Sequence, residues 1–157
     1  MRDTLVLYLT AATLCSAIGS SVVALFADRY SWTLRFAVFP LLCLSGLLSL
    51  AVAAMALLEG VTLALKLPFG LPWLYWHLRL DPLAGFFLGI IGIITAIVSI
   101  YGPSYTRKYS QSPYSLSALG FFTGLFVAGM QLVVLADDAF AFMVAWESMA
   151  LSSFFLV

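Results

Sequence analysis

The sequence has 157 residues, of which 64% are hydrophobic and only 9% charged, with seven basic and seven acidic side chains. Soluble domains are about half apolar and about a quarter charged, so this composition excludes an ordinary soluble globule and indicates an integral membrane protein. The net charge of zero and the lack of a basic run argue against nucleic acid as a partner.

Apolar runs bounded by charged residues predict about five membrane-spanning helices. A helix needs about 20 apolar residues to cross about 30 Å of hydrocarbon. The predicted spans cover residues 4–26, 36–58, 83–101, 116–135 and 139–157. Asp81 and Pro82 suit the N-cap and first turn of the third span, and Gly102 and Pro103 are expected to end it. We therefore predict an all-α integral membrane fold in a single transmembrane domain.

The two ends of the sequence lead to two further expectations. The first apolar run is longer than the core of a typical signal peptide, and no small-x-small cleavage site follows it. We expect it to be retained as a helix. The fifth span ends at Val157 without a polar or basic flank, so we expect these residues to be the N-terminal part of a longer chain.

Basic residues on the two sides of the predicted bundle suggest its orientation. One side carries Arg2, Lys66 and Arg79, and the other carries Arg29, Arg35, Arg107 and Lys108. Because Lys66 and Arg79 belong to a long connection, the short loops of the second side carry more positive charge, and such loops face the cytoplasm. We expect a multi-pass protein of the inner (plasma) membrane with its N-terminus outside.

Residues 59–81 form the sizeable connection outside the spans. Apolar residues alternate with others on both sides of a proline- and glycine-containing turn at residues 68–72: Val61, Leu63, Leu65 and Leu67, then Leu74, Trp76, Leu78 and Leu80. This pattern predicts a small two-stranded hairpin. Since an isolated hairpin is marginal in water, it should rest on the bilayer rim, on its own helices or on a neighbouring subunit.

Glu147 is the charged residue that lies well inside a predicted span, about nine residues after the start and roughly 13 Å into the hydrocarbon. A carboxylate at that depth must be paired, hydrated or neutralised by a proton. We therefore take Glu147 as the candidate proton-transfer residue and Ser148 and Ser152 as candidate pathway lining. The alternatives are a protonated glutamate that hydrogen-bonds between helices, and serines that let helices pack closely.

Other small or polar residues favour structural roles. Pairs of glycines four residues apart predict close helix packing in the third and fourth spans, at Gly85, Gly89, Gly120 and Gly124. Gln131 is expected to make a structural hydrogen bond, and the Asp137–Asp138 turn to place carboxylates at a helix N-terminus. Cys15 and Cys43 are interpreted as buried small hydrophobes and His77 as a solvated loop residue. We expect no metal site, cofactor or catalytic residue.

Three stretches together resemble a known family. They are LRLDPLAGFF at residues 78–87, YGPSYTRKY at 101–109 and FMVAWESMALSSFFLV at 142–157. They are similar to the N-terminal third of the antiporter-like proton-pumping subunits shared by respiratory complex I, Mrp sodium/proton antiporters and membrane-bound hydrogenases. Within this superfamily the likeness is strongest to the branch of hydrogenase-4 component B and formate hydrogenlyase subunit 3.

The resemblance implies a mechanism for Glu147. In the family a glutamate of the fifth helix pairs with a lysine of the seventh helix, and changes in this pair couple electron transfer to proton movement. Glu147 stands in the position of that glutamate. The implied protein is a proton-translocating subunit without a redox centre, whose partners are the lipid bilayer and other membrane subunits of a hydrogenase or complex I-like assembly.

Several alternatives stay open. Sodium could replace the proton, and the electron donor could be a hydrogenase, formate, NADH or carbon monoxide. The chain could also be a small structural or assembly subunit with no ion pathway of its own. An independent five-helix transporter is a weaker interpretation, since such folds usually need a second repeat.

Overall fold

The computed structural model describes residues 2–26, 34–71, 74–108 and 115–157, and the structural account is confined to them. Five helices in these ranges are long and apolar enough to cross a membrane. They are α1 (Arg2–Ala24), α3 (Phe39–Glu59), α4 (Pro82–Lys108), α5 (Leu116–Leu135) and α6 (Ala139–Leu156). A short π-helical segment, η2 (Leu34–Val38), leads directly into α3. The predicted all-α membrane fold is confirmed.

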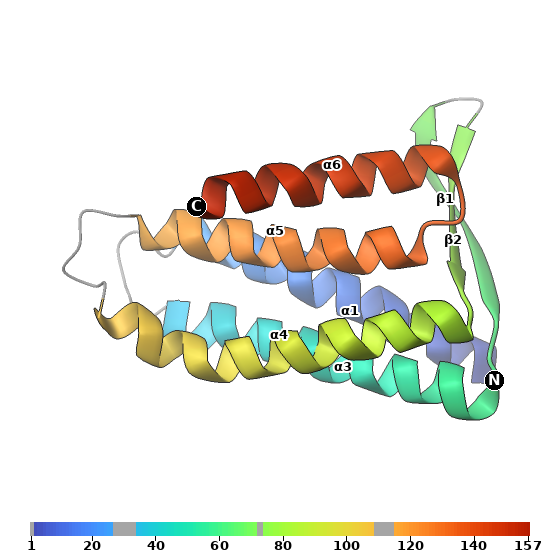
Figure 1. The fold of residues 1–157 in the computed structure, drawn as a ribbon, viewed down its shortest axis with the longest axis horizontal. Coiled ribbons are helices and arrows are strands. Elements are labelled where there is room, and N and C mark those ends of the chain that lie inside the picture. Colours follow the sequence, from blue (N-terminus) through green and yellow to red (C-terminus); the bar gives the residue numbers. More distant parts are fainter. Residues whose placement is uncertain (1, 27–33, 72–73, 109–114) are drawn as a thin grey trace.

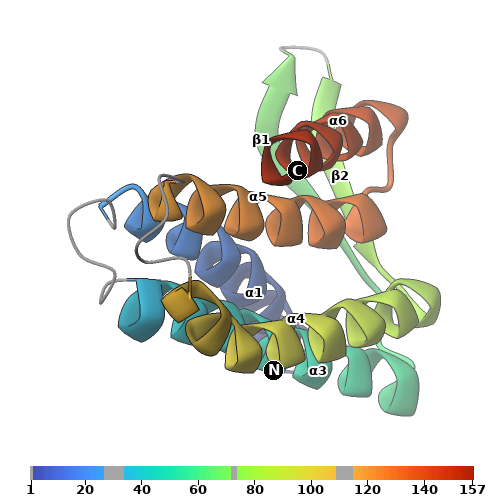
Figure 2. The same ribbon diagram turned by 60° about the vertical axis from the view of Figure 1, so that its left-hand side comes forward.

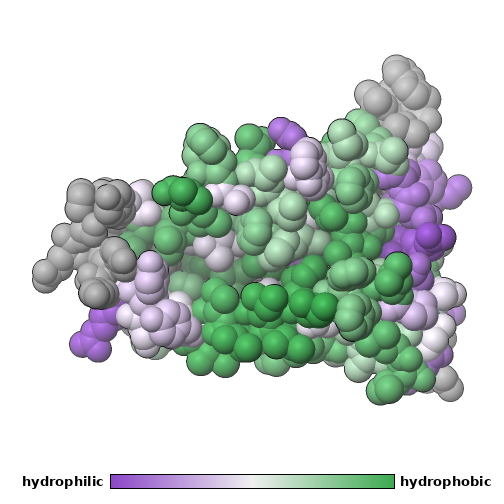
Figure 3. All heavy atoms as spheres, in the orientation of Figure 1, coloured by the Kyte–Doolittle hydropathy of each residue, from purple (hydrophilic) through white to green (hydrophobic). Residues whose placement is uncertain are grey.

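The helices are arranged as two antiparallel pairs with one helix between them. Helices α3 and α4 lie side by side, α5 and α6 form the second pair, and α1 contacts both α3 and α5 (Figures 1 and 2). Apolar side chains cover the middle of the molecule, and hydrophilic residues gather toward its two ends (Figure 3). Arg29, on which the expected orientation partly rests, lies outside the described residues, and that orientation stays a prediction.

The predicted hairpin is present between α3 and α4. Strands β1 (Leu63–Leu71) and β2 (Leu74–Leu80) pair antiparallel from Leu63–Leu80 to Leu71–Leu74, with an irregularity between Leu67 and Gly70. The first strand therefore runs into the expected turn at 68–72, and Pro72 itself lies outside the described residues. Leu78 and Leu80 are buried against helix residues, so the hairpin rests on its own helices, one of the three supports expected for it.

Small residues bring α3 and α4 into close contact, as the Gly85–Gly89 pair predicted. A Cβ atom built on Gly85 would lie 2.6 Å from the Cβ of Ala56, and one on Gly89 would lie 3.3 Å from the Cβ of Ala53. The sequence analysis missed a still closer approach. A Cβ on Gly92 would lie 2.8 Å from the carbonyl oxygen of Gly46, so backbone packs directly on backbone there.

Helix α4 is longer than predicted, and its expected end at Tyr101 is corrected to Lys108. Pro103 lies inside the helix, where it removes one backbone donor from the helical ladder. The hydroxyl of Thr106 donates to the carbonyl oxygens of Gly102, at 3.0 Å, and of Pro103, at 3.3 Å. Hydroxyl groups and neighbouring helices commonly allow membrane helices to continue through a proline, because they reoccupy freed backbone groups.

The interpretation of both cysteines as buried hydrophobes is wrong for Cys15. Helix α1 buries the face that carries Thr13, Ser16 and Ala17, and Cys15 lies away from that face and is exposed. Cys43 is half-buried on α3. The polarity of the buried face explains the error, because hydroxyl groups that donate to carbonyls of their own helix pack inside as readily as apolar groups.

Candidate functional site: a groove around Glu147

Helix α6 carries Glu147 near its middle. The helix begins after Asp138, whose side chain accepts a hydrogen bond of 2.7 Å from the backbone N–H of Ala141 and so caps the helix. Glu147 follows eight residues after Ala139, about 12 Å along a helix of 18 residues. The cap at Asp138 therefore sets the depth of the glutamate.

The predicted site residues lie together in one open groove between α5 and α6. Glu147, Ser148 and Ser152 line this groove, whose volume is about 440 Å³. Its remaining walls are apolar: Phe122, Leu125, Val144, Leu151 and Phe155. The rings of Phe122 and Phe155 stack with their centroids 4.7 Å apart. The groove thus contains one carboxylate and two hydroxyl groups in hydrocarbon surroundings.

The polar groups of this groove differ in how they are satisfied. Ser152 is fully buried, and its hydroxyl donates to the carbonyl oxygen of Ser148 at 2.7 Å. The oxygen lone pairs of that hydroxyl can still accept hydrogen bonds. Glu147 is exposed, and none of the described residues pairs with its carboxylate. The carboxylate is thus free, within the described part of the chain, to meet a proton, water or a counter-charge.

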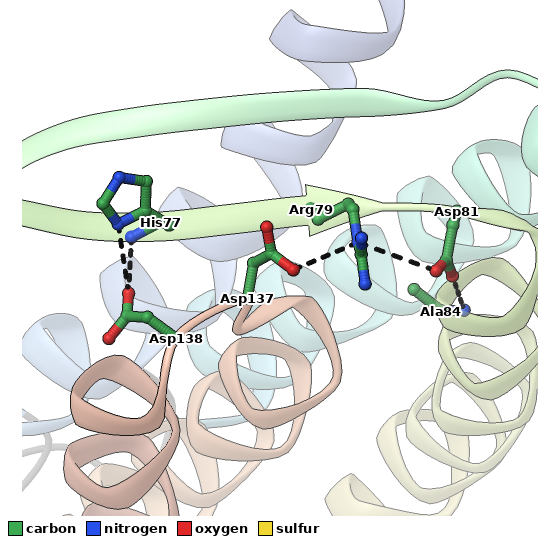
Figure 4. A network of polar contacts seen from close by, with 6 residues as sticks. All are labelled: His77, Arg79, Asp81, Ala84, Asp137 and Asp138. Atoms are coloured by element: carbon green, nitrogen blue, oxygen red, sulfur yellow. Dashed lines mark hydrogen bonds and ion pairs between the residues drawn. The ribbon is translucent and has the colours of Figure 1, made fainter.

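A separate polar network lies at the hairpin end of the bundle (Figure 4). The backbone N–H of His77 donates to Asp138 Oδ2 at 2.7 Å, and His77 Nδ1 lies 3.6 Å from the same oxygen. Arg79 Nε lies 3.1 Å from Asp137 Oδ1 and 3.8 Å from Asp81 Oδ2. These contacts join β2 to the α5–α6 turn and to the start of α4.

The Asp138 carboxyl is the group of this network whose protonation is perturbed. Partial burial raises its pKa, but hydrogen bonds from the backbone N–H groups of Ala141, His77 and Phe140, together with the charge of His77, lower the pKa further. The net result is a pKa below the ordinary value for aspartate. Asp138 is therefore ionised at neutral pH and holds the start of α6 against β2.

Sequence reasoning found the cap but not the pairing. Asp138 and Asp81 were expected at helix starts, and both accept hydrogen bonds from the first turns of their helices. His77 was interpreted as a solvated loop residue, whereas its side chain is 35% exposed and lies beside the Asp138 carboxylate. A separation of 61 residues hides this contact from any local pattern.

Gln131 makes the structural hydrogen bonds that were predicted for it. Its side chain is fully buried, and Nε2 donates to the hydroxyl oxygens of Ser45, at 2.9 Å, and Ser49, at 3.0 Å. Gln131 thereby links α5 to α3. Within the described ranges, no three His, Cys, Asp or Glu side chains gather as they would to hold a metal ion.

Comparison with known proteins reveals partial relatives of the chain, although no protein-family model matches it. It is 33% identical to hydrogenase-4 component B of Escherichia coli K12 over 112 residues, which are 71% of this chain and 16% of that protein. It is 26% identical to NADH-quinone oxidoreductase subunit L of Rickettsia typhi over 148 residues, which are 89% of this chain and 22% of that subunit. The chain thus spans less than a quarter of either relative.

Proposed function

Since this chain belongs with the antiporter-like membrane subunits related to hydrogenase-4 component B and NADH-quinone oxidoreductase subunit L, we propose that it forms part of a proton-translocating subunit of a redox-driven complex. In this proposal the subunit carries no redox centre. Electron transfer in partner subunits drives protons through it, and Glu147 is the residue that takes up and releases them. The subunit lies in the inner membrane, with its N-terminus outside.

The observation that carries the proposal is the position of Glu147 in the groove between α5 and α6. A carboxylate at mid-depth in a membrane helix costs several kcal/mol unless it gains a proton, water or an opposite charge. Its free energy therefore depends strongly on what enters the groove. A group with that property can be switched by movement of a nearby charge, which is what coupling to a distant redox reaction needs.

Ser148 and Ser152 have supporting roles in this mechanism. The hydroxyl of Ser152 donates to its own helix, so its oxygen presents lone pairs to a water molecule in the groove. Such a water can pass a proton to or from the Glu147 carboxylate. The counter-charge comes from outside the described residues, and the family resemblance implies a lysine of the seventh helix.

The test is Glu147→Gln in the full-length subunit within its complex, with proton movement measured in vesicles during electron transfer. Proton movement should be abolished or sharply lowered while the complex still assembles, since glutamine keeps the shape but cannot exchange a proton. Glu59→Gln, an exposed acidic residue at the end of α3, is the matched control and should pump normally. An assembled Glu147→Gln complex that pumps at the normal rate would remove Glu147 from the mechanism.

The transported ion can be settled in the same vesicles. We propose the proton, so pumping should persist when sodium is replaced by potassium. Loss of coupled transport in sodium-free buffer, restored by added sodium, would assign sodium instead.

A second candidate function is a structural or assembly subunit without an ion pathway. The backbone contact between Gly46 and Gly92 and the hairpin clamp around Asp138 favour it, because both are devices for holding helices in place. This alternative requires that enlarging Gly85 or Gly120 disrupts assembly while Glu147→Gln has no effect on any measured property. The two candidate functions therefore predict opposite results for Glu147→Gln.

A further inference from the structure

A layer of polar side chains crosses the interior of the bundle between two hydrophobic clusters. One cluster includes Ala17, Leu42 and Val127, and the other includes Val6, Val52 and Leu135. Along α1, α3 and α5 the residues between these clusters are polar: Thr13, Ser45, Ser49 and Gln131. Each of these four side chains is at most 1% exposed. Their hydrogen bonds therefore have to be found inside the protein.

The hydrogen bonds of this layer determine how the Gln131 amide is oriented. Ser45 Oγ donates to the carbonyl oxygen of Thr13 at 2.9 Å, and Ser49 Oγ donates to the carbonyl oxygen of Ser45 at 2.9 Å. Because each hydroxyl has spent its proton, both can only accept from Gln131, and the NH₂ group must face them. Gln131 Oε1 then faces elsewhere in the core, where no described residue donates to it.

Thr95 on α4 presents a second buried polar atom of this kind. The residue is 5% exposed, and its Oγ1 has no hydrogen-bond partner among the described residues. Other buried hydroxyls of the same helix bond to their own backbone: Ser99 donates to the carbonyl oxygen of Thr95 at 2.6 Å, and Thr106 to that of Gly102 at 3.0 Å. The Thr95 hydroxyl is an exception to this pattern.

The packing of α3 on α4 puts Thr95 at the depth of the polar layer. A Cβ on Gly46 would lie 2.8 Å from the Gly92 carbonyl oxygen and 2.9 Å from the Ala96 nitrogen. Ser45 and Thr95 each precede one of these contacting residues. In two antiparallel right-handed helices, residues one step before the contact turn to the same side of the pair. Thr95 therefore faces the side on which Ser45 meets Gln131.

We propose that Thr95 and Gln131 bind a buried water molecule that bridges α4 and α5. The water donates one hydrogen bond to Gln131 Oε1 and shares another with Thr95 Oγ1. Buried waters typically satisfy polar groups that have no protein partner, in sites that are polar and enclosed, and both conditions hold here. Helices α4 and α5 are in contact, so one molecule can span between them.

This site is separate from the groove that contains Glu147. Gly129 of α5 packs against Met149 of α6, so Gln131 and Glu147 lie at similar depths, but Gln131 faces α3 while Glu147 lines the groove on the α6 side. The inference therefore stands whether or not Glu147 transfers protons.

The test is a structure of the full-length protein in its complex, at a resolution that shows ordered waters elsewhere in the membrane region. We expect a density peak within hydrogen-bond distance of both Thr95 Oγ1 and Gln131 Oε1, and its loss in Thr95→Val. Thr106→Val, whose hydroxyl bonds to its own helix, is the matched control and should retain the peak.

Three results would overturn the inference. They are a wild-type map without the peak, a direct hydrogen bond from Thr95 to Gln131, and a side chain from the rest of the protein bonded to Gln131 Oε1. The wild-type map decides the question by itself if Thr95→Val does not assemble.

Discussion

Replacing Gly92 with alanine tests the closest backbone approach in the bundle. The added Cβ would lie 2.8 Å from the carbonyl oxygen of Gly46, 3.2 Å from the backbone nitrogen of Leu50 and 3.1 Å from its Cγ. Comfortable carbon–oxygen contacts are about 3.3–3.6 Å, so α3 and α4 must separate by about half an ångström. Two of the three atoms are backbone atoms and cannot turn aside.

The magnitude follows from two opposing effects. Overpacking of this kind costs about 1–3 kcal/mol, and separation of the helices weakens contacts along their whole length. Alanine recovers up to about 1 kcal/mol through its higher helix propensity. The net expectation is a loss of about 1–2 kcal/mol in the free energy of unfolding.

Gly19→Ala on α1 is the matched control. A Cβ on Gly19 meets nothing within 4 Å, so this substitution should be neutral or slightly stabilising. Reversible unfolding of the full-length subunit in bilayers, measured by steric trapping, compares the two variants directly. Equal stabilities for Gly92→Ala and Gly19→Ala would refute the reasoning. Combining Gly92→Ala with Gly46→Ala should cost less than the sum of the single changes, because the first change already separates the helices.

Two further substitutions test the polar contacts. Gln131→Leu removes two interhelical hydrogen bonds, each worth about 0.6 kcal/mol in a membrane protein, so the free energy of unfolding should fall by about 1 kcal/mol in the same assay. An unchanged or higher stability would contradict the proposed link between α3 and α5. Asp138 has a pKa below its ordinary value, so its stabilisation is complete above the pKa of an unfolded aspartate, about 3.9, and is lost as pH falls through the lower folded value. Asp138→Asn should therefore show a shallower loss of melting temperature below about pH 4 than the wild type, and identical pH profiles would show that the carboxylate does not stabilise this junction.

The sequence by itself determined the elements of this protein, since their signals are local. Apolar runs set the five spans because a membrane helix must be about 20 residues long, and the aspartates at 81 and 138 marked two helix starts because a carboxylate satisfies the free N–H groups of a first turn. Alternation of apolar residues likewise predicted the hairpin. The depth of Glu147 followed from the same local facts.

Tertiary structure alone decided how these elements meet. Helix α4 continues through Pro103, against its local signal, in a bundle where Phe39 packs on Gly102 and the Thr106 hydroxyl bonds the carbonyls beside the proline. The partners of Gln131 lie 82 and 86 residues away, and His77 meets Asp138 across 61 residues. Glu147 faces an open groove because α5 covers the other side of α6. Such outcomes depend on which helix faces pack together, and a one-dimensional pattern does not contain that choice.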